Sequence, residues 1–186
     1  GIRFDTPKLK IMGVEAVKSS TPEVCRGKIK EAIRMIMNKS EEDLIKFVND
    51  FKEVFKKLSP EEVAFPRSCN NLNKYSDSSS IYKKGTPIHV KGGLIYNHYI
   101  YRNKLQMKYP LIKDGDKIKF LMLKQPNTIK DTVISFSTRI PEEFNLHKYV
   151  DYDTQFEKTF TDPLKFILDS IGWKLEREAS LESFFE

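Results

Sequence analysis

The sequence predicts an α+β fold in which helices and an antiparallel sheet occupy different stretches of the chain. Two amphipathic helical patterns, at 20–37 and 40–58, follow one another with only a short break between them. Two strand patterns, at 117–123 and 132–136, are separated by a turn, and an apolar helical stripe follows from about Pro141. We therefore expect a helical hairpin, a small antiparallel sheet and a C-terminal helix.

The run from Pro7 to Pro22 predicts a strand that leads into a helix. Apolar Leu9 and Ile11 alternate with their neighbours, and Gly13 allows a bulge or a close backbone approach. Lysines on a strand edge, next to small hydroxyls at a helix N-terminus, suit the binding of phosphate oxygens. A solvated lysine face is the alternative. The residues concerned are Lys8, Lys10, Lys18, Ser19 and Ser20.

The first helix is expected to start at Ser20 or Thr21, with Pro22 at its first position. Ser20 and Glu23 have the spacing of a capping box. Ser40 is expected to cap the second helix, and the following acidic residues complement its dipole. The second helix should end at Ser59-Pro60, and the short connection predicts an antiparallel hairpin.

Residues 60–93 are rich in turns, with short strands expected at 63–65 and 88–90. A helix is expected from Leu94 to Leu105. Lys91-Gly92-Gly93 precedes it, and two readings of this triplet stay open. Exposed backbone N–H groups at a helix start could cradle a phosphate, or the glycines could simply form a tight turn.

The two strands at 117–123 and 132–136 should pair across the turn at Gln125-Pro126-Asn127. Beyond them, large apolar residues recur every four positions, with a kink or restart expected at Asp162-Pro163. This stripe should pack on the first helical hairpin. Its members are Tyr152, Phe156, Phe160, Leu164 and Leu168.

Charge is distributed unevenly along the chain, whose net charge is +6. Residues 63–130 hold 13 basic and only 3 acidic side chains, whereas 131–186 hold 6 basic and 12 acidic ones. A basic block of this kind is typical of a polyanion-binding surface. No basic amphipathic helix with large apolar anchors dominates, so nucleic acid is a better candidate than a membrane surface.

Catalytic and metal-binding patterns are lacking in the sequence. Cys25 and Cys69 have neither CxxC spacing nor a histidine pair nearby, which argues against a metal site. The pairs Asp151/Asp153 and Asp114/Asp116 are better explained by a helix start and a turn than by two-metal chemistry. We therefore expect no metal site, no cofactor and no catalytic residue in this chain.

The last residues have an unusual composition for a polar terminus. Phe184 and Phe185 stand together in the acidic stretch 180–186. Adjacent aromatics of this kind are typical of anchors for a hydrophobic pocket on another protein. The alternative is that both pack on this domain.

With these residues in view, the chain resembles the C-terminal region of family B DNA polymerases, most closely the replicative polymerases of T-even-type bacteriophages. The resemblance is strongest from Pro7 to Pro22, where Lys-Leu-Lys-Ile-Met-Gly is followed by Glu and by Lys-Ser-Ser-Thr-Pro. It extends unevenly over nearly the whole chain. The Ser-rich stretch 76–80, with Lys83-Lys84, departs from the family pattern.

The resemblance implies a polymerase thumb that holds the primer-template duplex through its phosphate backbone. It implies phosphate contacts for five residues of the run from Pro7 to Pro22, namely Lys8, Lys10, Lys18, Ser19 and Ser20. Asn70, Asn71, Lys74 and Tyr75 resemble the thumb loop that meets the duplex, and Lys91 with Gly92 resembles a basic turn of the same thumb. Ser180, Leu181, Phe184 and Phe185 resemble the tail that tethers such polymerases to a sliding clamp.

The domain organisation expected from this resemblance has three parts. Residues 1–20 would be the end of the palm, 21–175 the thumb domain and 176–186 the clamp-binding tail. The partners would be double-stranded DNA, the clamp and the palm, fingers and exonuclease of the polymerase. Magnesium would belong to the upstream palm, so this chain alone should be inactive.

The first residue is Gly, which predicts an excised or processed fragment. The resemblance implies a cut-out C-terminal piece or the small product of a split polymerase gene. The expected place of action is the cytoplasm of the infected bacterium. Two alternatives stay open: a stand-alone protein that bridges DNA and a clamp, and a structural phage protein whose basic block binds an acidic partner.

Overall fold

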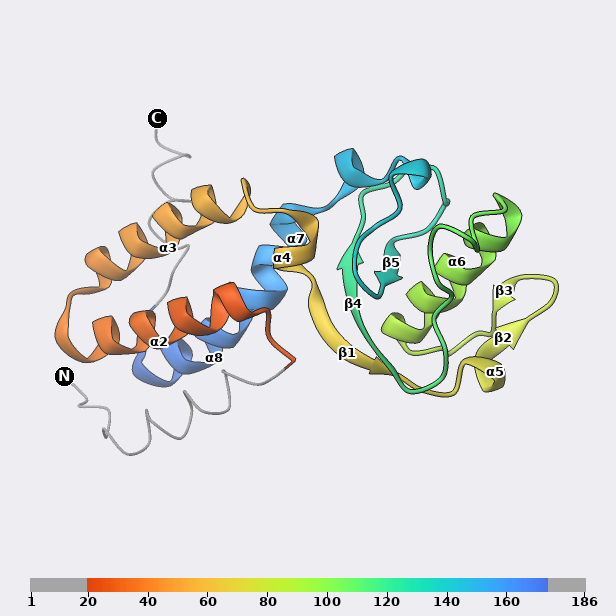
Figure 1. Ribbon diagram of the computed structural model, residues 1–186. Helices are drawn as coiled ribbons and strands as arrows, with labels where there is room; N and C mark the ends of the chain where they lie inside the picture. The colour runs from red at the N-terminus through yellow and green to blue at the C-terminus, as the bar shows by residue number, and fades with distance from the viewer. Residues whose placement is uncertain (1–19, 174–186) are drawn as a thin grey trace. The chain divides into compact units, whose positions relative to one another are not determined.

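The computed structural model describes residues 20–173, which divide into two compact units. Among the described residues, the first unit comprises 20–57 together with 156–173. The second unit is Leu58–Gln155. The first is helical and the second contains the sheet, which confirms the α+β class (Figure 1).

The first unit is a helical hairpin closed by a third helical segment (Figure 1). Helices α2 (Glu23–Asn38) and α3 (Glu41–Phe55) are joined by a two-residue connection. The chain returns as a π-helical turn, η3 (Glu157–Thr161), followed by α8 (Asp162–Ile171). All four present apolar residues to a shared core, as the helical spacing predicts.

Aromatic contacts confirm that the late apolar stripe packs on the hairpin. The Phe51 ring on α3 lies 4.9 Å from the Phe160 ring and 5.7 Å from the Phe156 ring, measured between centroids. Phe55 lies 5.2 Å from Phe156 in an edge-on arrangement. Aromatic pairs in this geometry add to the stabilisation from apolar burial alone.

Helix ends follow the expected chemistry at some positions and not at others. Ser40 caps α3, as predicted, and its hydroxyl accepts a hydrogen bond from the Asp43 N–H. The capping box predicted at Ser20 and Glu23 is wrong, because α2 begins later, with Pro22 as its N-cap residue. Helix α8 begins at Asp162, which confirms the predicted restart.

The second unit is built on a three-stranded antiparallel sheet in the order β1-β4-β5. Strand β4 (Asp116–Met122) pairs with β5 (Val133–Phe136), which confirms the predicted strand pair. Strand β1 (Phe65–Cys69) lies at the other edge of β4. The strand predicted at 63–65 is correct only at Phe65, because α3 is followed by a short helix, α4 (Pro60–Val63).

Helix α6 (Ile88–Arg102) packs against β5 (Figure 1). It confirms a helix in this region, but it starts six residues earlier than predicted, and the strand expected at 88–90 is wrong. Pro87 is its N-cap residue, and the Lys91 N–H donates to the Pro87 carbonyl oxygen. Lys91, Gly92 and Gly93 therefore lie inside the helix.

Short elements complete the second unit, the last of which ends at Phe156, the first residue of the returning part of the first unit. They are α5 (Leu72–Tyr75), β2 (Ser76–Asp77), β3 (Ile81–Tyr82), η1 (Glu142–Phe144), η2 (His147–Tyr149) and α7 (Tyr152–Phe156). Strands β2 and β3, of two residues each, pair as a short antiparallel hairpin. Within residues 20–173 no helix combines the length and apolarity needed to cross a membrane.

Candidate nucleic-acid interface

The positive charge of the described residues is concentrated in the second unit. Leu58–Gln155 carries 15 basic and 10 acidic side chains, whereas the described part of the first unit carries 11 and 10. Attraction to a polyanion scales with the number of cations that face it. The second unit is therefore the place to look for a nucleic-acid surface.

A well-anchored loop presents Asn70, Asn71 and Lys74 to solvent. The Leu72 N–H donates to the Asp114 carboxylate at 2.7 Å, which fixes the start of α5. Asn71 adopts the left-handed conformation with φ of 66°, which asparagine tolerates better than most residues. All three side chains are exposed, while Tyr75 is half-buried with the Lys74 ammonium 5.2 Å from its ring centroid.

The β2–β3 hairpin brings two more lysines to the same loop. The Lys83 N–H donates to the Tyr75 carbonyl oxygen at 2.8 Å, which ties the end of the hairpin to α5. Lys83 and Lys84 are both exposed. We call residues 70–84 the basic segment. Three cations and two exposed amides on a short stretch of fixed backbone match the chemistry of phosphate contacts.

Lys91 contacts Tyr82 of this segment and forms an ion pair with Asp131. Its Nζ is 3.1 Å from the Asp131 carboxylate and 4.8 Å from the centroid of the Tyr82 ring. The Tyr82 hydroxyl donates to the same carboxylate at 2.6 Å. Burial opposes the charge, but the hydrogen bonds to Asp131 and Tyr82 outweigh it and raise the Lys91 pKa. Lys91 is thus charged but largely neutralised by its neighbour.

Gly92 has a packing role. A Cβ at this position would lie 2.4 Å from the Ser135 Oγ and 2.8 Å from the Ser135 backbone nitrogen. The glycine lets α6 approach β5, where the Ser135 hydroxyl donates to the His89 carbonyl oxygen at 2.8 Å. The interpretation of Gly92 as part of a phosphate-binding helix start is therefore wrong, because the residue is buried inside α6.

The other predicted contact residues fall at or beyond the ends of the described chain. Ser20 lies half-buried in the turn before α2. The remaining positions lie outside the described residues: Lys8, Lys10, Lys18, Ser19, Ser180, Leu181, Phe184 and Phe185.

The acidic pairs have structural partners. The Asp151 carboxylate accepts hydrogen bonds from the Thr154 N–H and hydroxyl at the start of α7. Asp114 anchors Leu72, and the Asp116 carboxylate accepts from the Lys113 N–H. Within residues 20–173 no group of three histidine, cysteine or acidic side chains is placed to hold a metal ion.

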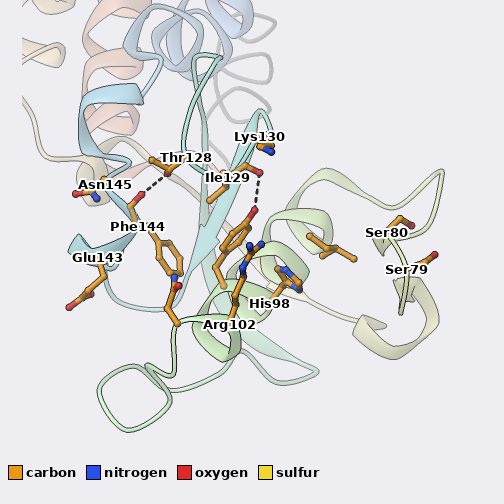
Figure 2. A pocket seen from close by; sticks show the side chains of 13 residues that line it. Ser79, Ser80, His98, Arg102, Thr128, Ile129, Lys130, Glu143, Phe144 and Asn145 are labelled. Atoms are coloured by element: carbon orange, nitrogen blue, oxygen red, sulfur yellow. Dashed lines mark hydrogen bonds between the residues drawn. The ribbon is translucent and has the colours of Figure 1, made fainter.

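Sequence reasoning missed a hollow of about 580 Å³ in the second unit (Figure 2). It lies beside the C-terminal half of α6 and is lined by segments 79–81, 128–130 and 143–145 as well. Only one signal for it was readable: His98 and Arg102 are four residues apart and share a helix face. The other walls come from turns that are distant in the sequence.

The comparisons with known proteins find that the chain is similar to part of two phage DNA polymerases. It is 31% identical to the DNA-directed DNA polymerase of Enterobacteria phage T4 over 187 residues, covering 98% of this chain and 20% of that enzyme. It is 34% identical to the DNA-directed DNA polymerase of Escherichia phage RB69 over 191 residues, covering 100% of this chain and 21% of that enzyme.

No protein-family model matches the chain. The chain spans about a fifth of the length of the relatives that it matches. The resemblance found from the first run of the sequence is confirmed: the chain is related, along its whole length, to part of the T-even-type phage family B polymerases.

Proposed function

We propose that this chain, a relative of one fifth of the T-even-type phage polymerases, is the thumb region that holds the duplex during DNA replication. The observation that carries the proposal is the similarity to two DNA-directed DNA polymerases over essentially the entire chain. The surplus of basic residues in the second unit supports it. Contacts to the phosphate backbone position a protein without reading sequence.

The basic segment is the proposed contact surface within the second unit. Asn70, Asn71 and Lys74 are exposed, and the Tyr75–Lys83 hydrogen bond keeps the segment in one conformation. Lys91 supports the segment indirectly, because its ion pair with Asp131 holds the carboxylate that accepts the Tyr82 hydrogen bond. Lys8, Lys10, Lys18, Ser19 and Ser20 are proposed as further phosphate contacts where the palm ends.

The C-terminal tail, residues 176–186, is proposed to tether the polymerase to its sliding clamp. Leu181, Phe184 and Phe185 supply apolar anchors in an otherwise acidic stretch. Buried aromatic anchors of this kind dominate the binding energy of small interfaces. A tether of this type would keep the enzyme on its template between nucleotide additions.

Catalysis is proposed to reside elsewhere in the complete polymerase. Two-metal nucleotidyl transfer needs carboxylates that hold two divalent cations about 4 Å apart. The carboxylates of Asp114, Asp116 and Asp151 are engaged in helix-start and turn hydrogen bonds. Magnesium would therefore be bound by the palm, and the place of action would be the cytoplasm of the infected bacterium.

Duplex binding by the full chain tests the proposed grip. The affinity for duplexes of unrelated sequence should be equal, and log K should fall steeply with log salt concentration. Replacing Lys74, Lys83 and Lys84 by alanine should reduce the salt slope by up to about 3, since each phosphate contact contributes about 0.9. Strong sequence preference or salt-insensitive binding would contradict the proposal.

A matched control uses three exposed lysines of the first unit. Lys30, Lys46 and Lys57 replaced by alanine remove the same charge from outside the basic segment. The salt slope should stay near that of the unchanged protein. An equal loss in both triple variants would show that net charge alone, and not this segment, governs binding.

Deletion of residues 180–186 tests the tether separately. Binding to the clamp should be lost while duplex affinity is retained. Loss of duplex binding in this variant would contradict the assignment of the tail to the clamp.

A further inference from the structure

The hollow beside α6 contains chemistry that duplex binding leaves unused. His98, Tyr99 and Arg102 line it from α6, and segments 128–130 and 143–145 form the facing walls (Figure 2). Ser79 and Ser80 lie at its rim on the β2–β3 connection. A volume of about 580 Å³ is in the range for a small organic ligand and far exceeds that of a single phosphate ion.

The charge that lines the hollow is positive. Arg102 and Lys130 are exposed, and neither side chain has an ion pair or hydrogen bond within the described part of the chain. The one acidic lining residue, Glu143, is 2.6 Å from the Lys108 ammonium, which lies outside the hollow. That hydrogen bond lowers the Glu143 pKa to about 2. An anion entering the hollow therefore meets two free cations and a carboxylate that is already neutralised.

A fixed aromatic surface lies next to these cations. The Tyr99 hydroxyl donates to the Ile129 carbonyl oxygen at 3.4 Å, and its ring meets the Phe144 ring edge-on at 6.1 Å. The Thr128 hydroxyl donates to the Phe144 carbonyl oxygen at 2.6 Å and links the two facing walls. A flat apolar group can therefore lie against a surface that needs no rearrangement.

We propose that this hollow binds one unpaired nucleotide, with its phosphate at Arg102 and Lys130 and its base against Tyr99. A guanidinium matches phosphate geometry, and a base of any sequence can stack on an aromatic ring. The site goes beyond the proposed function, because a paired duplex keeps its bases stacked inside the helix. The nucleotide comes either from solution or from the unpaired end of a strand.

Amide NMR of the full chain titrated with deoxyadenosine monophosphate tests the site. Resonances of residues 98–103 and 128–130 should shift, with half-saturation at or below about 5 mM. Deoxyadenosine and inorganic phosphate, titrated separately, should each bind at least about tenfold more weakly. Equal binding of phosphate alone, shifts confined to other residues, or no shift would overturn the proposal.

Two substitutions examine the cations one at a time. Arg102→Met and Lys130→Met replace exposed side chains and should each weaken nucleotide binding about tenfold. Lys104→Met is the control, because Lys104 is an exposed neighbour outside the lining of the hollow. Unchanged affinity in both test variants, or an equal loss in the control, would overturn the proposal.

Comparing the affinities of the chain for duplexes with and without one unpaired terminal nucleotide identifies the source of the nucleotide. Tighter binding of the overhang, lost in Arg102→Met, assigns the site to a strand end, whereas equal binding of the two duplexes assigns it to free nucleotide. This site and the duplex grip fail independently. Absence of nucleotide binding with normal duplex affinity would overturn the site alone, and the reverse result would overturn the grip alone.

Discussion

The Met122 N–H at the end of β4 donates a hydrogen bond to the side-chain oxygen of Gln155 at 2.9 Å. The amide nitrogen of the same glutamine donates to the Val63 carbonyl oxygen at 2.7 Å. Gln155 is fully buried, so one polar side chain satisfies backbone groups from the end of α4 and from β4 in the second unit. Buried backbone groups are costly to leave without partners.

Replacing Gln155 by leucine should therefore destabilise the second unit strongly. The apolar side chain has a similar size but leaves the Met122 N–H and the Val63 carbonyl without this partner. The expected loss in free energy of unfolding is about 2–4 kcal/mol, measured by urea denaturation. Gln106→Leu, at an exposed position, is the control and should change stability by less than about 0.5 kcal/mol. Equal stability of the two variants would contradict the bridging role.

Two glycine-to-alanine substitutions should have opposite effects on stability. Gly92→Ala forces a Cβ to within 2.4 Å of Ser135 and should lower the free energy of unfolding by about 1–3 kcal/mol. Gly27→Ala in α2 meets nothing within 4 Å and should raise it by about 0.5–1 kcal/mol through helix propensity. Thermal unfolding of both variants checks the pair. A neutral Gly92→Ala would contradict the close approach of α6 to β5.

The Lys108–Glu143 ion pair should be visible in the titration of Glu143. The hydrogen bond from Lys108 lowers the folded-state pKa of Glu143 from 4.5 to about 2. A lowered pKa stabilises the folded state above about pH 4.5, and this contribution is lost as the pH falls toward 2. In Lys108→Met the pKa should rise toward 4.5, as followed by carboxyl ¹³C NMR. An unchanged pKa would show that Lys108 is not its cause.

The aromatic cluster of the first unit should dominate the stability of that unit. Phe51 contacts both Phe156 and Phe160, so Phe51→Ala should cost about 3–5 kcal/mol. Phe166 on α8 is 69% exposed and offers a matched control, with a cost expected below about 1 kcal/mol. Circular dichroism during denaturant unfolding measures both. Similar losses in the two variants would contradict a core centred on Phe51.

Periodicity predicted the long elements of this fold because each has one buried face. The α3 pattern places Leu44, Val48, Phe51 and Phe55 on a single stripe, and all four are buried. Strands β4 and β5 were readable from their apolar runs and the turn between them. Local chemistry also located the Ser40 cap, since serine followed by acidic residues is a strong start signal.

Other features were hidden because tertiary contacts decide them. The beginning of α6 reads as a strand at Ile88–Val90, since this helix is buried on several sides and lacks a clean period. Strand β1 contains Pro66, which a strand tolerates at the edge of a sheet but which weakens its sequence signal. The ion pair of Lys91 and Asp131 joins residues forty positions apart, so the sequence alone showed only a basic residue.

The π-helical turn Glu157–Thr161 explains why a strict four-residue repeat can stay on one side of a helical segment. In a regular α-helix each fourth residue advances about 40° around the axis, so a long four-residue repeat would wind away from its partner. The π-helical turn rotates less per residue than an α-helix, so Phe160 and Leu164 remain on the buried side with Phe156. Because this turn holds one residue more than an α-helical turn, deleting one residue within 157–161 should close it to a regular α-helix and change the orientation of α8 little, whereas deleting a second residue should rotate α8 by about 100° and expose Leu164 to water. The wide turn therefore accommodates one additional residue while the same face of α8 stays buried.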